Sequence, residues 1–472
     1  MTRPAFTGAI LLAAALAAPV AAQPRTNGAN SVVPGTSAGS GADPPRANAP
    51  LAPPRSENAP AAPLDLTPGS LPRAEIANPT ATRLELATAL QLADESSPRL
   101  RIAATRVEGA RASVVTARQY PNPDAELLGG RQTDRVPNVP SGSITFFGFA
   151  QPLDLPWVRE PRIRSAEAGL AGSELGLAET RLLLRALVTQ AFYDVLRRKA
   201  EAELAFDTQR LFEQIRNRIE VRVNVGEAPR FELTRADAEL AAAINTTNSA
   251  RLRVAQAIAV LRAAIGAPLP LELDVVGELA QAPTLPPLDQ LRTEALSRYP
   301  AIAQAEAEVR RAQARLETER ALRIPQPTLR AGVEREPELD KFRVGVSLPI
   351  PIFNQRQGQV GEAVAAFQQA TIAAEQTRIE VRSALEAAYS RYDVARAQIA
   401  AFEGGLLKQA ESALRVAEAA FRFGERGFID VLDAQRVLRQ VRADFLAARF
   451  ELQSALIEIE RLRSSQLEPV RQ

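Results

Sequence analysis

The chain contains 472 residues, of which 57 are Lys or Arg and 55 are Asp or Glu, so its formal net charge is only +2. This near balance gives no indication of a basic face that would bind nucleic acid. The sequence contains no cysteine and no histidine, and its single methionine is Met1. These absences exclude disulfides and the soft or imidazole ligands of Zn²⁺ and Cu⁺ in the mature chain, and they remove the commonest general acid–base residue. We therefore expect no metal site, no cofactor and no enzymatic activity.

Residues 1–22 are expected to form a secretory signal peptide. A short positive region precedes the apolar residues 5–18, and the small residues at 20–22 fit a cleavage site. An uncleaved membrane anchor is the alternative, but the apolar stretch is shorter than the ~20 residues that a spanning helix needs. Residues 23–80 are rich in Pro, Ala, Gly, Ser and Asn and show no periodicity, so this N-terminal segment is expected to be disordered.

The second half of the chain repeats the layout of the first, which is typical of a tandem structural unit rather than a single catalytic core. Tyr120–Pro123 (Tyr-Pro-Asn-Pro) corresponds to Ile324–Pro327 (Ile-Pro-Gln-Pro). An apolar ladder that steps by three and four recurs 198 positions later. In the first half it comprises Leu233, Ala236, Leu240, Ala243, Thr247, Ala250, Val254, Ala257, Leu261 and Ala264. We expect one repeat at 81–270 and a second at 285–464, followed by a C-terminal tail at 465–472.

Long helices dominate the predicted secondary structure. Helices are expected at 84–119, 161–225, 231–266, 288–323, 358–423 and 428–463. The first helix of each half ends at a proline, which cannot continue a helix. Glycine and proline at 226–229 and 424–427 interrupt the long helical stretches. Heptads held over more than four repeats indicate coiled coils, and alanine at every second seam position of the first half requires the helices to approach closely.

Two strands are expected in each half, between the first helix and the long helices. Their ranges are 124–131, 143–153, 328–335 and 342–350. Apolar and polar residues alternate along them, so each strand has one apolar face, and the lengths suit membrane-spanning β-strands. The residues assigned to membrane strands are Phe147, Phe149, Leu329, Ala331, Val333, Phe342, Val344 and Val346. Phe146, Phe147, Phe149 and Trp157 are candidates for an interfacial aromatic girdle, and the alternative is a soluble hairpin packed on a helix.

Four strands in one chain are too few to close a barrel, and they leave two open edges that lipid does not tolerate. The chain is therefore expected to pool its strands with copies of itself, and three copies would contribute twelve strands and a tube of long helices. The predicted fold is a mixed α/β membrane protein, a tandem repeat of two strands plus long coiled-coil helices. Its trimer would form a twelve-stranded β-barrel that continues as an α-helical barrel.

Three segments carry a family resemblance that covers residues 82–463. They are 226–240, Gly424–Gln435 and Val346–Gly358. In the second segment a small turn residue precedes Asp-Val-Leu-Asp-Ala, which opens a long helix. With these segments the chain resembles the TolC family of outer-membrane efflux proteins, and the third segment resembles the branch that serves cobalt–zinc–cadmium exporters.

The resemblance implies a homotrimer whose barrel lies in the lipid of the bacterial outer membrane and whose helices extend through the periplasm. Such a protein is the exit duct of a tripartite efflux system and passively conducts substrate, with heavy-metal cations as a candidate cargo. Its implied partners are a periplasmic adaptor (membrane fusion) protein and an inner-membrane pump of the resistance–nodulation–division type. The helix turns expected to contact the adaptor comprise Val225, Gly226, Glu227, Phe423, Gly424 and Glu425.

The resemblance also implies a periplasmic gate made of carboxylates and an arginine-centred network. Asp430 and Asp433 match its acidic positions, Arg426 matches its arginine, and Glu232 matches the acidic position of the first half. The sequence departs from the family at Phe421, where a tyrosine is familiar, so one hydrogen bond of the closing network that the resemblance implies is not expected here. The alternative role for Asp430 is to stabilise the N-terminus of a helix through the helix dipole.

The sequence leaves other functions open. One is a soluble periplasmic coiled-coil scaffold, in which the strands form a small sheet on a helical stalk. Another is an outer-membrane duct for drug efflux or for type I protein secretion. An enzyme is disfavoured because the chain has no phosphate-binding glycine loop, no Ser–His pairing and no metal-ligand spacing.

Overall fold

The computed structural model describes residues 82–131, 142–270, 272–279 and 283–464, all within one compact unit, Ala74–Gln472. The expected signal peptide, the Pro/Ala-rich segment at 23–80 and the C-terminal tail lie outside the described residues. In the ranges described, none of the helices combines the length and the apolar character needed to cross a membrane.

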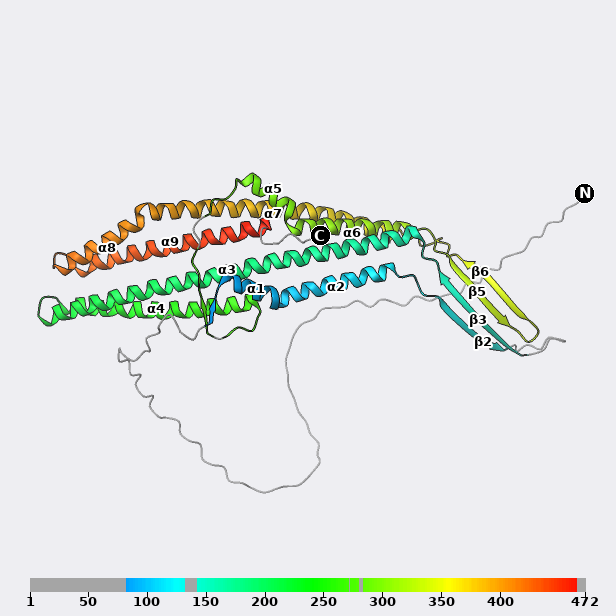
Figure 1. Ribbon diagram of the computed structural model, residues 1–472, viewed down its shortest axis with the longest axis horizontal. Coiled ribbons are helices and arrows are strands. Elements are labelled where there is room, and N and C mark those ends of the chain that lie inside the picture. The colour runs from blue at the N-terminus through cyan, green and yellow to red at the C-terminus, as the bar shows by residue number, and fades with distance from the viewer. Residues whose placement is uncertain (1–81, 132–141, 271, 280–282, 465–472) are drawn as a thin grey trace, which may run out of the picture. The chain divides into compact units, whose positions relative to one another are not determined.

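The described chain passes through the same order of elements twice (Figure 1). The first repeat contains β1 (Thr82–Leu84), α1 (Leu86–Ser96), α2 (Pro98–Arg118), β2 (Asp124–Arg131), β3 (Ser143–Pro152), α3 (Pro156–Asn224) and α4 (Arg230–Ile265). The second contains β4 (Leu273–Val275), α5 (Leu288–Arg298), α6 (Pro300–Ala321), β5 (Thr328–Arg335), β6 (Asp340–Ser347), α7 (Gln357–Ala401), the π-turn η1 (Phe402–Leu406), α8 (Leu407–Arg422) and α9 (Phe428–Arg463). The duplicated layout expected from the sequence is therefore present in the structure.

Each helix expected at the start of a repeat is in fact two helices. The breaks fall at Ser97 and Tyr299, whose ψ angles of 123° and 121° are extended. Both residues precede a proline, and the proline ring disfavours helical ψ at the residue before it. Pro98 and Pro300 then occupy the first position of the next helix, where the missing N–H costs nothing. The prediction of one helix at the start of each repeat was wrong, because Pro98 and Pro300 each end one helix and begin the next.

The long helical stretches were predicted more accurately, with one exception. Helix α9 has the predicted bounds, and α3 begins at Pro156, five residues before its predicted start at 161. The predicted helix at 358–423 is interrupted by η1, where Gly405 adopts φ 146° and ψ −21°. The two repeats therefore differ at this point, because the 69-residue helix α3 has no such break.

The four longer strands form an antiparallel sheet in the order β2-β3-β5-β6. The central β3–β5 pair joins the two repeats, and β2 and β6 are the edges. One row of facing residues crosses the sheet as Leu127, Phe147, Val333 and Phe342. The four predicted strands are confirmed, with differences at three ends. β3 ends one residue early, at Pro152, and β6 begins two residues early, at Asp340. β6 ends at Ser347 rather than at 350, ahead of Pro349, which has no N–H for a ladder.

Three apolar clusters hold the helices together. The first joins α1, α3 and α4 to the short parallel β1–β4 pair, which the sequence did not predict. The second joins α5, α6, α7 and α9, and it also includes Leu182 of α3. The third joins the far ends of α3 and α4 to α8 and the start of α9, so it connects the two repeats. In α4 the alanines of the seam are buried as expected: Ala236, Ala243, Ala250, Ala257 and Ala264.

Candidate functional site

The turn between α3 and α4 and the turn between α8 and α9 lie at the same end of the helices, away from the sheet (Figure 1). The third apolar cluster joins the helices next to both turns: Ile219 of α3 and Ala236 of α4 belong to it together with Phe421 and Phe428. We call the residues from Val221 to Leu233 and from Ala419 to Val431 the tips of the two repeats.

Both tips are closed by the same backbone hydrogen bonds. The amide of Glu227 donates to the carbonyl of Arg222 over 2.8 Å, and the amide of Glu425 donates to the carbonyl of Ala420 over 2.9 Å. The glycines before them, Gly226 and Gly424, adopt φ angles of 82° and 76°. These are Schellman motifs, in which a left-handed residue lets the last carbonyls of a helix find donors.

The residues predicted to contact an adaptor are exposed at these tips. Val225 is 64% exposed and its counterpart Phe423 is 77% exposed. Phe231 and its counterpart Ile429 are also exposed at the starts of α4 and α9. Each tip therefore presents large apolar side chains, which is the character of a surface that binds a partner.

Two of the predicted gate carboxylates occupy equivalent positions. Glu232 lies in the first turn of α4 and Asp430 in the first turn of α9. Asp430 Oδ1 lies 3.6 Å from Arg426 Nη1, so the predicted arginine and carboxylate are brought together. The position of Asp430 also suits the helix dipole, so the two roles considered for it are compatible.

Asp433 belongs to an ion-pair chain that the sequence did not predict. Its Oδ1 lies 3.7 Å from Arg436 Nη1, and Arg436 Nη2 lies 3.4 Å from Glu239 Oε1 of α4. Next to this pair, the buried Gln435 side chain donates from Nε2 to Thr208 Oγ1 of α3 over 3.4 Å. Gln435 is part of the family segment, but its partner Thr208 on α3 lies more than 190 residues away along the chain, as does Glu239 on α4, the partner of Arg436. These contacts follow from packing alone.

Phe421, where the resemblance implies a tyrosine, makes aromatic and cation–π contacts. It is 4% exposed and its ring centroid lies 6.2 Å from that of Phe428. The guanidinium of Arg222, at the end of α3, lies 5.5 Å from the Phe421 centroid. A cation–π contact between Arg222 and Phe421 therefore links the two tips.

The residues predicted for membrane strands share one face of the sheet. The register places Phe149, Ala331 and Val344 in one row and Leu329 and Val346 in another, beside the row that contains Phe147. The large side chains on this face are 40–73% exposed.

The prediction for Phe146 was wrong. Its side chain lies on the opposite face of the sheet, over Gly148 and Gly332, where a Cβ would come within 2.8 Å of the ring. Consecutive strand residues point to opposite faces, so Phe146 cannot share a girdle with Phe147. Trp157 is exposed but lies in the first turn of α3 rather than on a strand.

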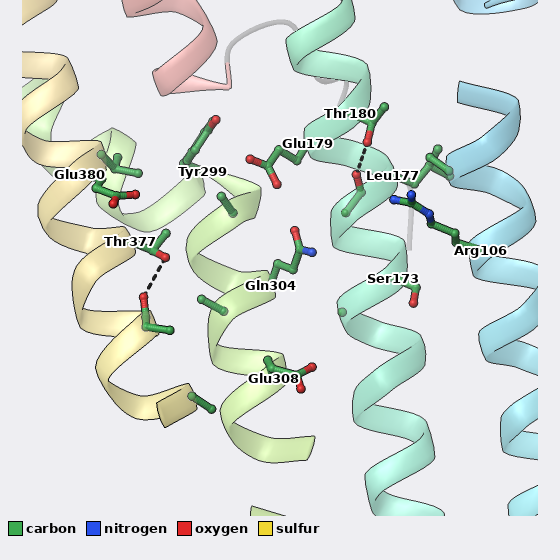
Figure 2. Close-up of a pocket in the computed structure, with 18 of the residues that line it drawn as sticks. Arg106, Ser173, Leu177, Glu179, Thr180, Tyr299, Gln304, Glu308, Thr377 and Glu380 are labelled. Atoms are coloured by element: carbon green, nitrogen blue, oxygen red, sulfur yellow. Dashed lines mark hydrogen bonds between the residues drawn. The ribbon is translucent and has the colours of Figure 1, made fainter. Parts of the chain in front are cut away.

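A polar cavity of about 790 Å³ lies among α2, α3, α6 and α7, and Figure 2 shows Glu179 of α3 and Gln304 of α6 directed into it. Burial raises the pKa of the Glu179 carboxyl, and the nearby Arg461 guanidinium partly opposes that shift. Burial also raises the pKa of Tyr299, whose hydroxyl accepts a hydrogen bond from Arg461. Across the described ranges, no group of three or more acidic side chains is arranged to hold a metal ion.

The sequence matches the model of the family described as "Outer membrane efflux protein" over residues 89–267 and 291–463. It is 28% identical over 381 residues to the cobalt-zinc-cadmium resistance protein CzcC of Cupriavidus metallidurans, covering 80% of this chain and 90% of that protein. It is 25% identical over 345 residues to the nickel-cobalt-cadmium resistance protein NccC of Alcaligenes xylosoxydans xylosoxydans, covering 68% of this chain and 72% of that protein.

A crystal structure of CusC, a protein that forms a transmembrane channel, superposes with a TM-score of 0.70 at 21% identity, over 80% of this chain and 91% of that chain. At this identity the match shows a shared fold. The family match extends over both repeats and includes both tips and the sheet. The chain therefore belongs to the outer membrane efflux protein family.

Proposed function

We propose that this protein is the exit duct of a tripartite efflux system, a homotrimer that passively conducts its cargo across the outer membrane. The observation that carries the proposal is the four-stranded sheet, which has one exposed apolar face and whose edge strands β2 and β6 pair with no further strand among the described residues. An exposed apolar face of this size needs lipid or protein against it. Open edges within lipid need another strand on each side.

Repeat symmetry indicates how the copies would join. Within one chain, the second long strand of the first repeat (β3) pairs with the first long strand of the second repeat (β5). The same contact between copies would pair β6 of one chain with β2 of the next. Three copies would then form the twelve-stranded barrel, with the apolar face outward against lipid.

Two partners are proposed: an adaptor that binds the exposed tips, and a pump that supplies the energy that a passive duct lacks. The exposed Val225 and Phe423, with Phe231 and Ile429, form the surface that we assign to a periplasmic adaptor. Energy would come from an inner-membrane pump of the resistance–nodulation–division type, and the chain itself would catalyse no reaction. Binding of the adaptor opens the duct only if the adaptor binds the open state more tightly than the closed state.

Arg426, Asp430, Asp433 and Glu232 are the residues that we assign to the periplasmic gate. In a trimer, three copies of each carboxylate would lie on a narrow circle, where they repel one another and attract cations. The cargo that we favour is a heavy-metal cation, because CzcC and NccC are named as resistance proteins for cobalt, cadmium, zinc and nickel. Carboxylates would concentrate such ions without the tight chelation that thiolates provide.

The test is single-channel conductance of the detergent-purified protein in a planar bilayer. We expect a small cation-selective conductance in the wild type, and a larger or less selective one in the double variant Asp430→Ala/Asp433→Ala. The control is Glu375→Ala/Asp393→Ala, which removes two exposed carboxylates from α7, distant from the tips. If the conductance and selectivity of Asp430→Ala/Asp433→Ala equal those of the wild type, these residues do not form the gate. A folded trimer that shows no conductance would contradict the proposed duct.

A further inference from the structure

The row of exposed apolar side chains on β6 continues beyond the end of the strand. On β6 the row contains three alternate residues: Phe342, Val344 and Val346. The connection from β6 to α7 lies at the junction of the sheet and the helices (Figure 1). Its large apolar residues are all exposed: Leu348, Ile350, Ile352 and Phe353. Ile350 is 76% exposed and Phe353 is 97% exposed, and a contiguous apolar surface of this kind marks a binding surface.

Two prolines keep the first part of this connection extended. Pro349 follows Leu348 and Pro351 follows Ile350, and a proline biases the residue before it towards an extended backbone. Successive residues of an extended chain point to opposite sides, so Leu348 and Ile350 continue the face of Val346. The amide of Ile352 donates to the carbonyl of Ile350 over 2.9 Å, a γ-turn that redirects the chain towards α7 only after Ile350.

The corresponding connection of the first repeat does not present such a surface. Between β3 and α3, Leu153 and Leu155 are both half-buried. The amide of Leu153 donates to the carbonyl of Pro327 over 3.0 Å, which ties this connection to the second repeat. The strong exposure of Ile350 and Phe353 is therefore a feature of the second repeat and not of every strand-to-helix connection in this fold.

A further strand paired to the β6 edge would leave these side chains uncovered. Strands join through backbone groups in the plane of the sheet, whereas side chains stand on its two faces. Phe149 on β3 and Val333 on β5 have a strand on each side and are still 49% and 40% exposed. The apolar residues of the connection therefore need a partner on the outer face of the sheet, which strand pairing between copies does not provide.

The height of the apolar band indicates what this partner is. A strand rises about 3.4 Å per residue, so Phe342 to Val346 covers about 14 Å of β6, or about 10 Å across a membrane at a tilt of about 40°. The apolar band of a membrane-spanning sheet is about 25 Å tall. At the hairpin end the next outward residues are Asp340 and Arg335, so the band stops there. Extension to Ile350 raises its height to about 20 Å, which brings it close to the thickness that lipid requires.

A cationic side chain lies beside the connection. Arg323, just after α6, is exposed, and its Nε donates to the carbonyl of Gln355 over 3.3 Å, two residues after Phe353. No carboxylate within the described ranges forms an ion pair with Arg323, so its guanidinium is available to an anion. Apolar side chains next to an arginine are the arrangement of a membrane interface, where the arginine reaches the lipid phosphates.

We propose that residues 348–353 insert into the periplasmic leaflet of the membrane, at the boundary between acyl chains and headgroups, with Arg323 at the level of the lipid phosphates. The lipid-facing surface of the second repeat then extends to the start of α7 rather than ending with β6. This inference rests on the proposed duct, because it assigns lipid to the outer face of the sheet.

The insertion is tested by tryptophan fluorescence of the full chain in phosphatidylcholine–phosphatidylglycerol vesicles. Trp157 is the only tryptophan, so Trp157→Phe gives a background into which Ile350→Trp is introduced. The quenchers are lipids brominated near the headgroup, lipids brominated near the end of the acyl chain, and iodide in the aqueous phase. We expect the Ile350→Trp emission to be quenched most strongly by bromine near the headgroup. Phe353→Trp, at the most exposed position, is the second reporter if Ile350→Trp does not fold.

Two matched reporters in the same background serve as controls. Phe342→Trp lies on β6 and should be quenched by brominated lipid, whereas Val416→Trp, exposed on α8, should respond only to iodide. Quenching of the connection reporter by iodide alone would overturn the insertion, and so would its protection from all three quenchers, which would show that protein covers it. Phe342→Trp separates the two proposals. Its failure to respond to brominated lipid would refute the membrane-spanning sheet and with it the duct, whereas its quenching without quenching at 350 and 353 would refute the insertion alone.

Discussion

Glu179 is a half-buried carboxyl group directed into the cavity among α2, α3, α6 and α7. Burial raises its pKa from the ordinary value of 4.5, and the opposing attraction of Arg461 is the smaller effect. The folded protein therefore binds this proton more tightly than the unfolded chain does. As pH rises above the ordinary carboxyl pKa, the unfolded chain loses this proton more readily than the folded protein does, so the free energy of unfolding falls. Below the ordinary pKa both states hold the proton, and Glu179 has no such effect.

We predict that Glu179→Gln raises the thermal unfolding midpoint at pH 8 and changes it little at pH 4, where the wild-type carboxyl is protonated. The measurement is thermal unfolding of the detergent-purified protein over that pH range. The control is Glu308→Gln in the same cavity, where Glu308 is exposed and paired with Arg311. If Glu179→Gln raises the unfolding midpoint equally at both pH values, ionisation of the Glu179 carboxyl is not the cause of the stabilisation.

At the scale of elements, the two tips show how glycine ends a helix in this fold. Gly226 and Gly424 lie at φ 82° and 76°, and a Cβ on either would meet nothing within 4 Å. The requirement for glycine is therefore purely a matter of backbone conformation. An L residue in the left-handed region costs roughly 1–2 kcal/mol.

We predict that Gly226→Ala and Gly424→Ala each destabilise the protein by about 1–2 kcal/mol. Gly361→Ala, in the interior of α7, should instead be neutral or stabilising, because alanine favours a helix and reduces the entropy of the unfolded chain. Denaturant midpoints of the three variants measure the difference. Equal effects at all three positions would show that the tips do not need a left-handed residue.

At the scale of the whole molecule, the repeat symmetry predicts a register between copies. Transferring the β3–β5 register to β6 and the β2 strand of the next copy places Val346 opposite Leu127 and Leu348 opposite Ala125. Val346 and Leu127 both belong to the exposed apolar face, so the transferred register keeps that face continuous across copies. A register shifted by one residue would instead place Val346 opposite a residue of the other face.

We predict that Leu127→Cys/Val346→Cys forms disulfides between copies, seen as dimers and trimers on a non-reducing gel. Directly opposed cross-strand residues bring their Cβ atoms within about 5 Å, which suits a disulfide. The wild-type chain contains no cysteine, so no other thiol competes. Leu127→Cys/Gly345→Cys is the control, since position 345 points to the opposite face. Cross-links in the control and not in the test pair would contradict the register.

The sequence predicted the elements that depend on local pattern. The alternation in β5 and the helical ladder in α9 gave the bounds that the structure has, because period and length distinguish a strand from a helix without tertiary information. It also identified Arg426 and Asp430, which are four residues apart and contact each other across one turn. It missed η1, because two glycines in a helical pattern signal only reduced helix propensity and do not show whether a turn widens.

What the sequence alone determined is the duplicated plan of strands and long helices, since each repeat carries its own periodicity and turn residues. Only the tertiary structure decided which segments of the two repeats meet. The β3–β5 pairing, the contact of Arg222 with Phe421 and the link from Gln435 to Thr208 all join residues from different halves. Such contacts depend on the register in which two amphipathic repeats pack, and many registers are compatible with the same periodic pattern. The choice among them is made by side-chain fit and burial over the whole interface.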